Sequence, residues 1–331
     1  MSRGGAMDVL SLAAANALVG NPAQAPALEF MFVGGEYELA AGAGHVAVAG
    51  GGFAVFRNGE RLSAYRSIRL VCGDVLRIGA SQDAVWGYLA VAGGFAVLPE
   101  LGSVSTHVRS GLGGIAGRAL IEGDALPLGL GEPPGDACAP ENVLYARERR
   151  GDGAIRVVLG PQEDHFDPPS LRTFLTEAFV VTHRMDRMGC NFLGPTLRHA
   201  RGADVVSDGI LAGSIQVPGS GQLIALLADC QPTGGYPKIA TVLSADVGRL
   251  AQRRPGAAVR FQAVTVEDGR RARIEFLDRI ERLPRRVVAA VQGQALHVHA
   301  GCTVPPSPRP GIPGCDGLAA VTASRHGQHG G

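Results

Sequence analysis

The chain has 331 residues, of which 46% are hydrophobic, and its formal net charge is +1. This length and apolar share predict a packed globular protein with room for two domains, not a disordered chain. The near-zero net charge argues against a nucleic-acid surface held by bulk electrostatics, and no apolar run reaches the roughly 18 residues that a membrane-spanning helix needs.

The basic residues are unevenly divided, because Lys238 is the single lysine and all the others are arginines. One interpretation is a genome that favours arginine codons. The other is that this position needs a compact ammonium, which a guanidinium cannot replace. The six cysteines form no C-x-x-C pair, which favours free thiols in a reducing compartment and hence the cytoplasm.

The first predicted element is a buried helix over residues 5–19. Asp8 suits the positive end of a helix, and Gly20 is typical of a helix stop. An alternative is a secretory signal, because Arg3 precedes the apolar run and an Ala-x-Ala sequence follows it. Asp8 and Asn16 favour the buried helix over the signal.

Short apolar runs with a period of two come next, and Asn58-Gly59 between two of them is typical of a type I′ hairpin turn. Repeated hairpins without βαβ alternation predict antiparallel barrels and argue against a parallel sheet. The predicted strands are residues 28–33, 45–49, 53–56, 67–71, 75–78 and 85–92.

The second half begins after a stretch rich in proline, glycine and charge, residues 129–154, which is typical of a domain linker. Helices are predicted at 168–177 and at 244–254, the latter with Ser244 as its N-cap. Strands are predicted at 155–159, 215–217, 223–228, 239–243 and 259–266.

From about residue 290 the composition predicts a mobile tail. Its metal-ligating side chains match no standard zinc spacing, so no metal site is predicted. These residues are His297, His299, Cys302, Cys315, His326 and His329.

Common phosphate and nucleophile motifs are absent: there is no P-loop and no G-x-S-x-G, and the glycines at 42–44 lead into a predicted strand instead of a helix. Two other segments can bind ligands. Gly113 and Gly114 can expose backbone amides to an anion beside Arg109, or can simply form a tight connection. Asp186 and Arg187 can orient a ligand, or can form an exposed ion pair.

The most informative segment runs from residue 207 to 238 and ends at Lys238. Polar side chains here follow an apolar strand and surround a Gly-Gly turn, and strand ends commonly present reactive groups. A glycine-rich hairpin with a solvated lysine is the alternative interpretation. The candidate residues are Asp208, Gln216, Asp229, Gln231, Thr233, Gly234, Gly235, Tyr236 and Lys238.

Several of these motifs, in this order, resemble one family, which includes the C-type subunit of 5-oxoprolinase, allophanate hydrolase subunit 2 and biotin-dependent carboxyltransferase family proteins. The similarity covers roughly residues 2 to 265. The motifs are residues 87–94, 101–103 with Thr106 and Arg109, 186–189, 199–204, 207–209, 215–219 and 234–242.

The resemblance implies a mainly β chain of two cyclophilin-like β-barrel units. These would be residues 1–130 and 155–290, with a linker at 131–154 and a disordered tail at 291–331. Relatives usually have a further segment before residue 2, so a first strand is expected to be missing here. Cys190 and Pro232 replace the tyrosine or threonine of many relatives.

The resemblance also implies a function: with two sister subunits, the chain would hydrolyse 5-oxo-L-proline to L-glutamate at the expense of ATP, which this chain or a partner binds. One alternative is a biotin-dependent carboxyltransferase that acts on a urea-like small amide, and another is a non-catalytic regulatory partner. Lys238, Asp229 and Asp208 would be catalytic. Substrate would contact Gln216, Gln231, Thr233, Gly234, Gly235, Tyr236, Arg109, Gly113, Gly114, Asp186 and Arg187.

Overall fold

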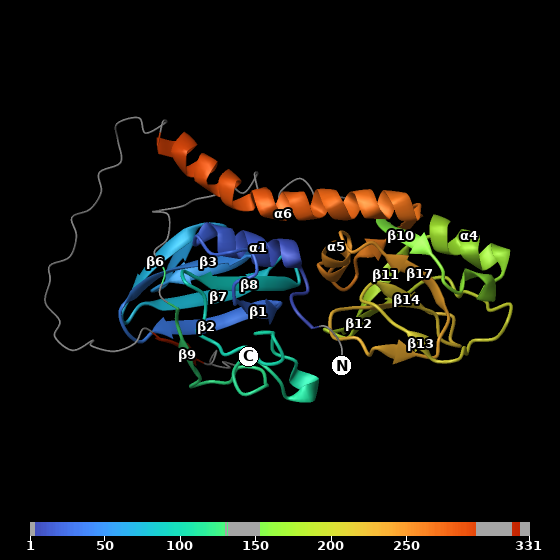
Figure 1. The fold of residues 1–331 in the computed structure, drawn as a ribbon, viewed down its shortest axis with the longest axis horizontal. Helices are drawn as coiled ribbons and strands as arrows, with labels where there is room; N and C mark the ends of the chain where they lie inside the picture. The colour runs from blue at the N-terminus through green and yellow to red at the C-terminus, as the bar shows by residue number, and fades with distance from the viewer. Residues whose placement is uncertain (1–3, 130, 132–152, 296–319, 325–331) are drawn as a thin grey trace, which may run out of the picture.

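The computed structural model describes residues 4–129, 131, 153–295 and 320–324. Within these residues the chain is mainly β, and its strands form two β-rich lobes that lie side by side under one long helix (Figure 1). The predicted fold class is therefore confirmed. No helix in the described ranges is long and apolar enough to cross a membrane.

The first lobe consists of two antiparallel sheets. One contains, in spatial order, β1 (Leu28–Met31), β8 (Trp86–Val91), β3 (Ala43–Ala49) and β6 (Ser67–Val71). The other contains β5 (Glu60–Leu62), β4 (Phe53–Arg57), β7 (Val75–Ser81), β2 (Val33–Leu39), β20 (Ala320–Ser324) and β9 (Ala125–Pro127). A 3₁₀ turn, η1 (Val108–Ser110), lies in the long connection between β8 and β9.

Two local predictions for this lobe are confirmed. Asn58 and Gly59 have φ of 50° and 84° and join β4 to β5, as a type I′ turn requires. Helix α1 (Val9–Leu18) begins after Asp8, whose carboxylate accepts a hydrogen bond from Ser11 N. Because α1 packs against β3 and β8 on one side and against the long helix on the other, it is apolar all round.

The second lobe is built around an eight-stranded sheet that is nearly closed. Its two edge strands, β18 (Ala258–Val259) and β19 (Phe261–Ala263), are separated in sequence by Arg260 alone, so the chain itself joins the two edges. Four buried phenylalanines pack inside: Phe174, Phe179, Phe192 and Phe261.

The remaining strands of this barrel, in spatial order between its edges, are β11 (Phe179–Met185), β12 (Gly189–Leu193), β15 (Ile224–Leu226), β14 (Ser214–Gln216), β17 (Lys238–Val242) and β10 (Ile155–Leu159). A separate two-stranded ribbon pairs β13 (Asp208–Gly209) with β16 (Thr233–Gly234). The short helices are η2 (Glu163–His165), α4 (Pro168–Thr176) and α5 (Val247–Ala251). The ribbon is called the β13–β16 ribbon below.

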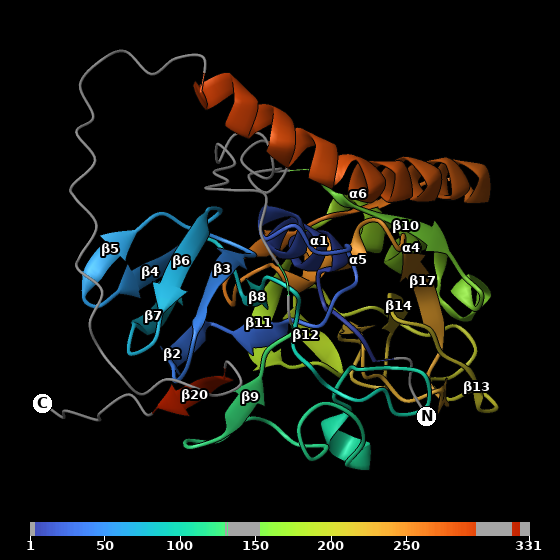
Figure 2. The same cartoon turned by 60° about the vertical axis from the view of Figure 1, so that its left-hand side comes forward.

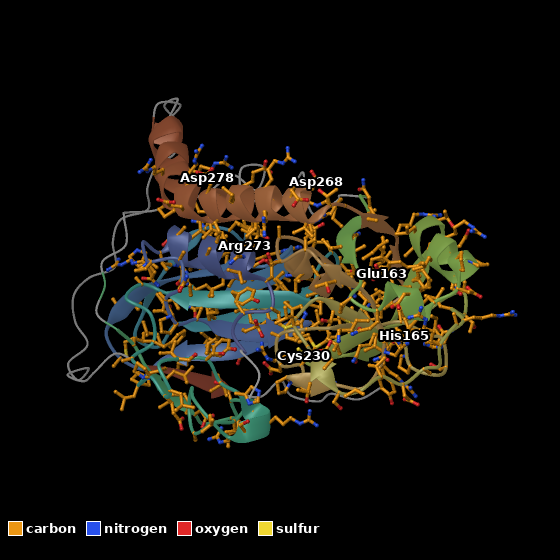
Figure 3. All side chains as sticks on the ribbon, turned by 45° about the vertical axis from the view of Figure 1, so that its right-hand side comes forward. Glu163, His165, Cys230, Asp268, Arg273 and Asp278 are labelled. Atoms are coloured by element: carbon orange, nitrogen blue, oxygen red, sulfur yellow. The ribbon has the colours of Figure 1, made fainter. Side chains whose placement is uncertain are left out.

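Helix α6 (Val266–Ala295) was not predicted. It is 30 residues long, lies across both lobes and contacts α1 (Figures 1 and 3). Its buried positions are Ala272, Leu283 and Val287, with Phe276 and Ile280 partly buried. The second half of the chain thus ends in a helix that returns to the first lobe.

Two predictions about local structure are corrected. Helix α5 is shorter than residues 244–254 and begins after Asp246, so Ser244 is not its N-cap. Within the proposed tail, β20 forms a strand between β2 and β9 of the first lobe (Figure 2). Most of the proposed linker and the tail's histidines and cysteines lie outside the described residues, and the domain boundaries stay a prediction.

Candidate functional site

Lys238 lies at the first position of β17, inside the second lobe. Only 3% of its side chain is exposed, and its Nζ donates to Asp208 Oδ2 at 2.8 Å. Asp208 belongs to the β13–β16 ribbon and its side chain is 52% exposed. The single lysine is therefore a buried ammonium, and its counter-ion closes over it from the surface. The alternative of a solvated lysine in a hairpin is excluded by this burial.

Gln162, which was not predicted, holds this pair together. Its Oε1 accepts from Lys238 N at 3.1 Å, and its Nε2 donates to Asp208 Oδ2 at 3.2 Å. Its own backbone N donates to Lys238 O at 3.1 Å. Because the amide oxygen of Gln162 binds the backbone of Lys238 and the amide nitrogen binds the carboxylate of Asp208, Gln162 fixes the position of Asp208. A lone glutamine after a strand carries no motif that could have identified it.

The Asp208 carboxylate acts as an ionised counter-ion to Lys238 and not as a proton acceptor. The hydrogen bond from Lys238 lowers its pKa, and the bonds from Gly209 N and Gln162 lower it further. Its second oxygen, Oδ1, accepts from Gly209 N at 2.7 Å. A carboxylate with both oxygens engaged and a depressed pKa is a weak base, so we expect Asp208 to position Lys238 and not to abstract a proton.

Gln216 pairs with Lys238 across β14 and β17. It is 2% exposed, and its Nε2 has no hydrogen-bond partner within the described residues. The β13–β16 ribbon covers it closely, because a Cβ on Gly234 would lie 2.8 Å from Gln216 Nε2 and 2.4 Å from Ile210 Cδ1. Gly234 is therefore a glycine because the ribbon backbone approaches the barrel. The structure brings together four of the predicted site residues: Asp208, Gln216, Gly234 and Lys238.

Asp229 and Arg187 form a different group, at the contact between the lobes. Arg187 Nε and Nη2 donate to Asp229 Oδ2 and Oδ1 at 2.8 and 2.9 Å, and Nη1 binds Glu29 of the first lobe. Burial alone would lower the pKa of Arg187, but the bonds to Asp229 and the charge of Glu29 raise it overall. Asp229 is 9% exposed, so its carboxylate is committed to joining the lobes.

Asp186 is not the partner of Arg187, and the hypothesis of an ion pair between these neighbours is wrong. Asp186 Oδ1 accepts from Met188 N at 2.7 Å and from Gly189 N at 3.1 Å. Asp186 thereby shapes the turn between β11 and β12. The side chain of Arg187, the next residue, points to the other lobe.

The predicted anion nest is also corrected at Gly113. Its N–H donates to Glu100 Oε2 at 2.7 Å, so a carboxylate of the chain itself takes this amide. A Cβ on Gly113 would lie 2.2 Å from Ser105 O, and one on Gly114 would lie 1.8 Å from Thr106 Oγ1. Close approach of the chain explains these glycines. The loop does not fit a nucleotide phosphate at Gly113.

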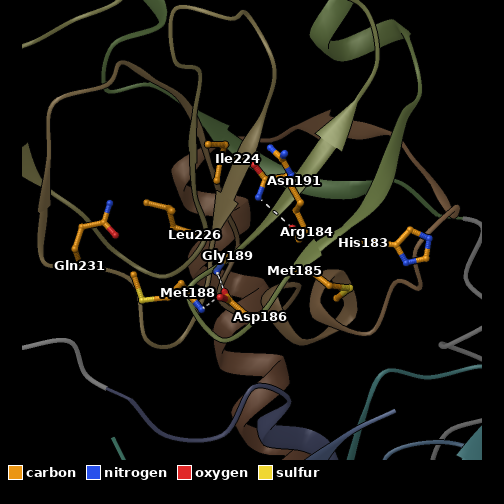
Figure 4. Close-up of a pocket in the computed structure, with 10 residues that line it drawn as sticks. All are labelled: His183, Arg184, Met185, Asp186, Met188, Gly189, Asn191, Ile224, Leu226 and Gln231. Carbon is orange, nitrogen blue, oxygen red and sulfur yellow. Dashed lines mark hydrogen bonds between the residues drawn. The ribbon is translucent and has the colours of Figure 1, made fainter. Parts of the chain in front are cut away.

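A pocket of about 340 Å³ opens beside the β11–β12 turn (Figure 4). Asp186 and Gln231 line it, together with Leu226 and Met188. Arg109 of the first lobe borders it, because its Nη1 donates to Met188 Sδ at 3.3 Å. Thr233 is exposed on β16 of the ribbon, whereas the half-buried Gly235 and the exposed Tyr236 lie in the segment between the ribbon and β17.

These positions define two neighbouring polar centres in the second lobe: the buried Lys238 group and the open pocket at Gln231. An apolar cluster of Ile210, Leu226 and Cys230 lies between them, since Leu226 lines the pocket and Ile210 packs near Gly234. The described residues contain no group of histidine, cysteine or carboxylate side chains that could hold a metal.

Comparison with known proteins identifies the family. Residues 1–263 match the family described as carboxyltransferase domain, subdomain A and B, and the chain belongs to this family. The chain is 34% identical over 286 residues to the C-type subunit of 5-oxoprolinase from Haemophilus influenzae, with 86% of this chain and 90% of that protein covered. The Escherichia coli protein of the same name is also 34% identical, over 290 residues, covering 87% and 91% of the two chains.

A solved structure confirms the fold. The Kluyveromyces lactis urea carboxylase superposes with a TM-score of 0.77 at 25% identity, covering 85% of this chain and 26% of that one. This chain therefore corresponds to about a quarter of that larger protein, whereas it spans most of the 5-oxoprolinase subunits.

Proposed function

We propose that this chain is one subunit of an ATP-dependent 5-oxoprolinase complex, which hydrolyses 5-oxo-L-proline to L-glutamate in the cytoplasm. Two sister subunits would complete the enzyme. Similarity over nearly the full length of two C-type subunits of 5-oxoprolinase supports the assignment. The observation that carries it is the buried Lys238–Asp208 pair beside Gln216, whose Nε2 has no partner among the described residues. These groups suit a small, planar amide substrate.

In this proposal Lys238 and Gln216 supply hydrogen-bond donors to the substrate, and Asp208 and Gln162 position Lys238. Gln231 and Arg109, at the open pocket, offer a second contact for the reacting complex. Asp229 and Arg187 act on the site only by holding the lobes together. ATP is bound by a sister subunit, which agrees with Glu100 taking the Gly113 amide.

A biotin-dependent carboxyltransferase is the second candidate, and the superposition with Kluyveromyces lactis urea carboxylase favours it. Under this alternative, the same donors would face urea or another urea-like amide, and biotin would arrive on a separate carrier. The coverage favours the first candidate, because this chain spans 90% of one 5-oxoprolinase subunit but 16% of the Lachancea kluyveri urea amidolyase.

Reconstitution tests the assignment. The full chain is mixed with the two sister subunits from the same source, and glutamate formation from 5-oxo-L-proline is measured with and without ATP. We expect ATP-dependent turnover that disappears when this chain is omitted. Carboxylation of urea with a biotinylated carrier, without 5-oxoproline turnover, would establish the second candidate instead. A complex that forms but turns over equally well without this chain would indicate a regulatory partner.

A further inference from the structure

The Lys238 group has more hydrogen-bond donors than acceptors. The Lys238 ammonium carries three N–H bonds, and within the described residues Asp208 is its one hydrogen-bond acceptor. Because only 3% of the Lys238 side chain is exposed, little water can reach the other two N–H groups of the ammonium. A buried donor without a partner is costly, so this surplus needs an explanation.

Gln216 adds to the surplus. Its Nε2 is buried and has no partner in the described part of the chain, although it lies on the strand next to Lys238. Directly paired residues on neighbouring strands have Cβ atoms about 5 Å apart, so both side chains serve the same small space. Native proteins leave few buried polar atoms unpaired, and functional sites account for some of them.

The charge of the group is already balanced. Lys238 and Asp208 form a neutral pair, and Gln162 and Gln216 are neutral amides. A site that is neutral yet rich in N–H donors favours a neutral acceptor over a second anion. The carbonyl oxygen of an amide is such an acceptor, and the same donors would stabilise the negative charge it gains when a nucleophile attacks.

The cover over this space is thin. Each strand of the β13–β16 ribbon has two residues, and Asp208, Gly209 and Thr233 are exposed. On its inner side Gly234 rests against Gln216 Nε2. If the Gly234 strand of this ribbon lifted while Asp208 stayed bound to Lys238, the two donors would open to solvent and the barrel sheet and the ion pair would both stay intact.

We propose that Lys238 Nζ and Gln216 Nε2 form a subsite for the carbonyl oxygen of a small amide, which enters when the Gly234 strand of the β13–β16 ribbon moves aside and Asp208 stays paired with Lys238. The proposal deepens the proposed function, on which the identity of the substrate rests. The subsite itself requires only an amide carbonyl, which 5-oxoproline and urea share.

The lone lysine makes the test direct, because labelling the full chain with [15N]lysine gives the signals of one residue. Three ring compounds separate the possible contacts: 5-oxo-L-proline, pyrrolidin-2-one, which lacks the carboxylate, and L-proline, which lacks the ring carbonyl. We expect the first two to shift the Lys238 signals saturably and L-proline to leave them unchanged. A shift with L-proline but not with pyrrolidin-2-one would overturn the proposal.

Gln216→Met supplies a second readout that a purely structural role would not give. Methionine has a similar length and removes the unpaired donor, so the variant should bind pyrrolidin-2-one at least about tenfold more weakly while its midpoint of unfolding in urea rises or stays the same. Gln262→Met, at an exposed position of β19, is the matched control and should change neither. Unchanged binding by Gln216→Met, or a lowered midpoint with unchanged binding, contradicts the subsite. Lactam binding without turnover in the reconstituted complex would leave the subsite intact and refute the proposed function alone.

Discussion

A buried ammonium is stable only where its charge is compensated, and at the residue scale this requirement explains Lys238. Asp208 supplies the compensating charge and Gln162 holds Asp208 in place. An arginine would bring a larger, planar group with a different donor geometry. The close packing of β14, β17 and the β13–β16 ribbon around this side chain therefore explains why a lysine persists in a chain whose other basic residues are arginines.

The ion pair has a measurable pH signature. Lys238→Met removes the hydrogen bond that contributes most to the low pKa of Asp208, so this pKa should rise toward the ordinary value of about 3.9. A depressed carboxylate pKa contributes stability above the unfolded-state value, and this contribution is lost as the pH falls through the folded-state pKa. The variant should therefore lose stability at neutral pH and less of it in acid.

Carboxyl NMR of Asp208 during a pH titration measures the effect. Asp124 is the internal control, because its pKa of about 2 results chiefly from Arg118 and should not respond to the substitution. An Asp208 pKa that stays depressed in Lys238→Met would show that Gly209 and Gln162 alone hold it down.

Residues adjacent in the sequence were the most predictable part of the site. The segment that ends at Lys238 identified Asp208 and Gln216, because polar residues around a glycine turn signal a presented group. Gln162 at the Lys238 group and Glu29 at the contact between the lobes were not identified, since each comes from a distant segment and belongs to no motif. Asp229 was predicted to be catalytic because it is a carboxylate at a strand end. Its bond to Arg187 gives it instead a structural role at the contact between the lobes.

At the element scale, short-range patterns predicted hairpins well and failed for α6. The Asn58-Gly59 turn needs only two residues to be recognised. Helix α6 contains Gly269 and Pro284 and many arginines, which concealed its apolar spacing. That spacing was nevertheless present in the sequence, at intervals of three and four residues: Ala272, Phe276, Ile280, Leu283 and Val287.

The packing of α6 can be tested with two leucines of the same helix. Leu283 is 1% exposed, whereas Leu277 is 47% exposed. Leu283→Ala should lower the free energy of unfolding by about 2–5 kcal/mol, because it leaves a cavity, and Leu277→Ala should change it by less than about 1 kcal/mol. Urea denaturation followed by circular dichroism measures both. Equal losses for the two variants would mean that α6 does not pack on the lobes as described.

At the scale of the whole molecule, the two lobes are joined by buried polar contacts as well as by α6. Gln252 Oε1 accepts from Val85 N and Trp86 N at 3.0 and 2.9 Å, and its Nε2 donates to Asp8 Oδ2 at 3.0 Å. Arg187 makes a second bridge, to Glu29. Contacts between segments this far apart in the sequence leave no local pattern, so the length and the family resemblance predicted two units but not how they meet.

The β13–β16 ribbon is the thin cover of the site in this two-lobed molecule, and Lys238 has the central role in the proposed reaction. The most direct measurement is ATP-dependent glutamate formation from 5-oxo-L-proline by the reconstituted complex containing Lys238→Met. Loss of one buried donor to a developing oxyanion predicts at least about a 100-fold fall in kcat, with no rescue by Lys238→Arg. Arg271→Met, which removes an exposed cation on α6, should retain full turnover. Undiminished turnover by Lys238→Met in the assembled complex would contradict the account.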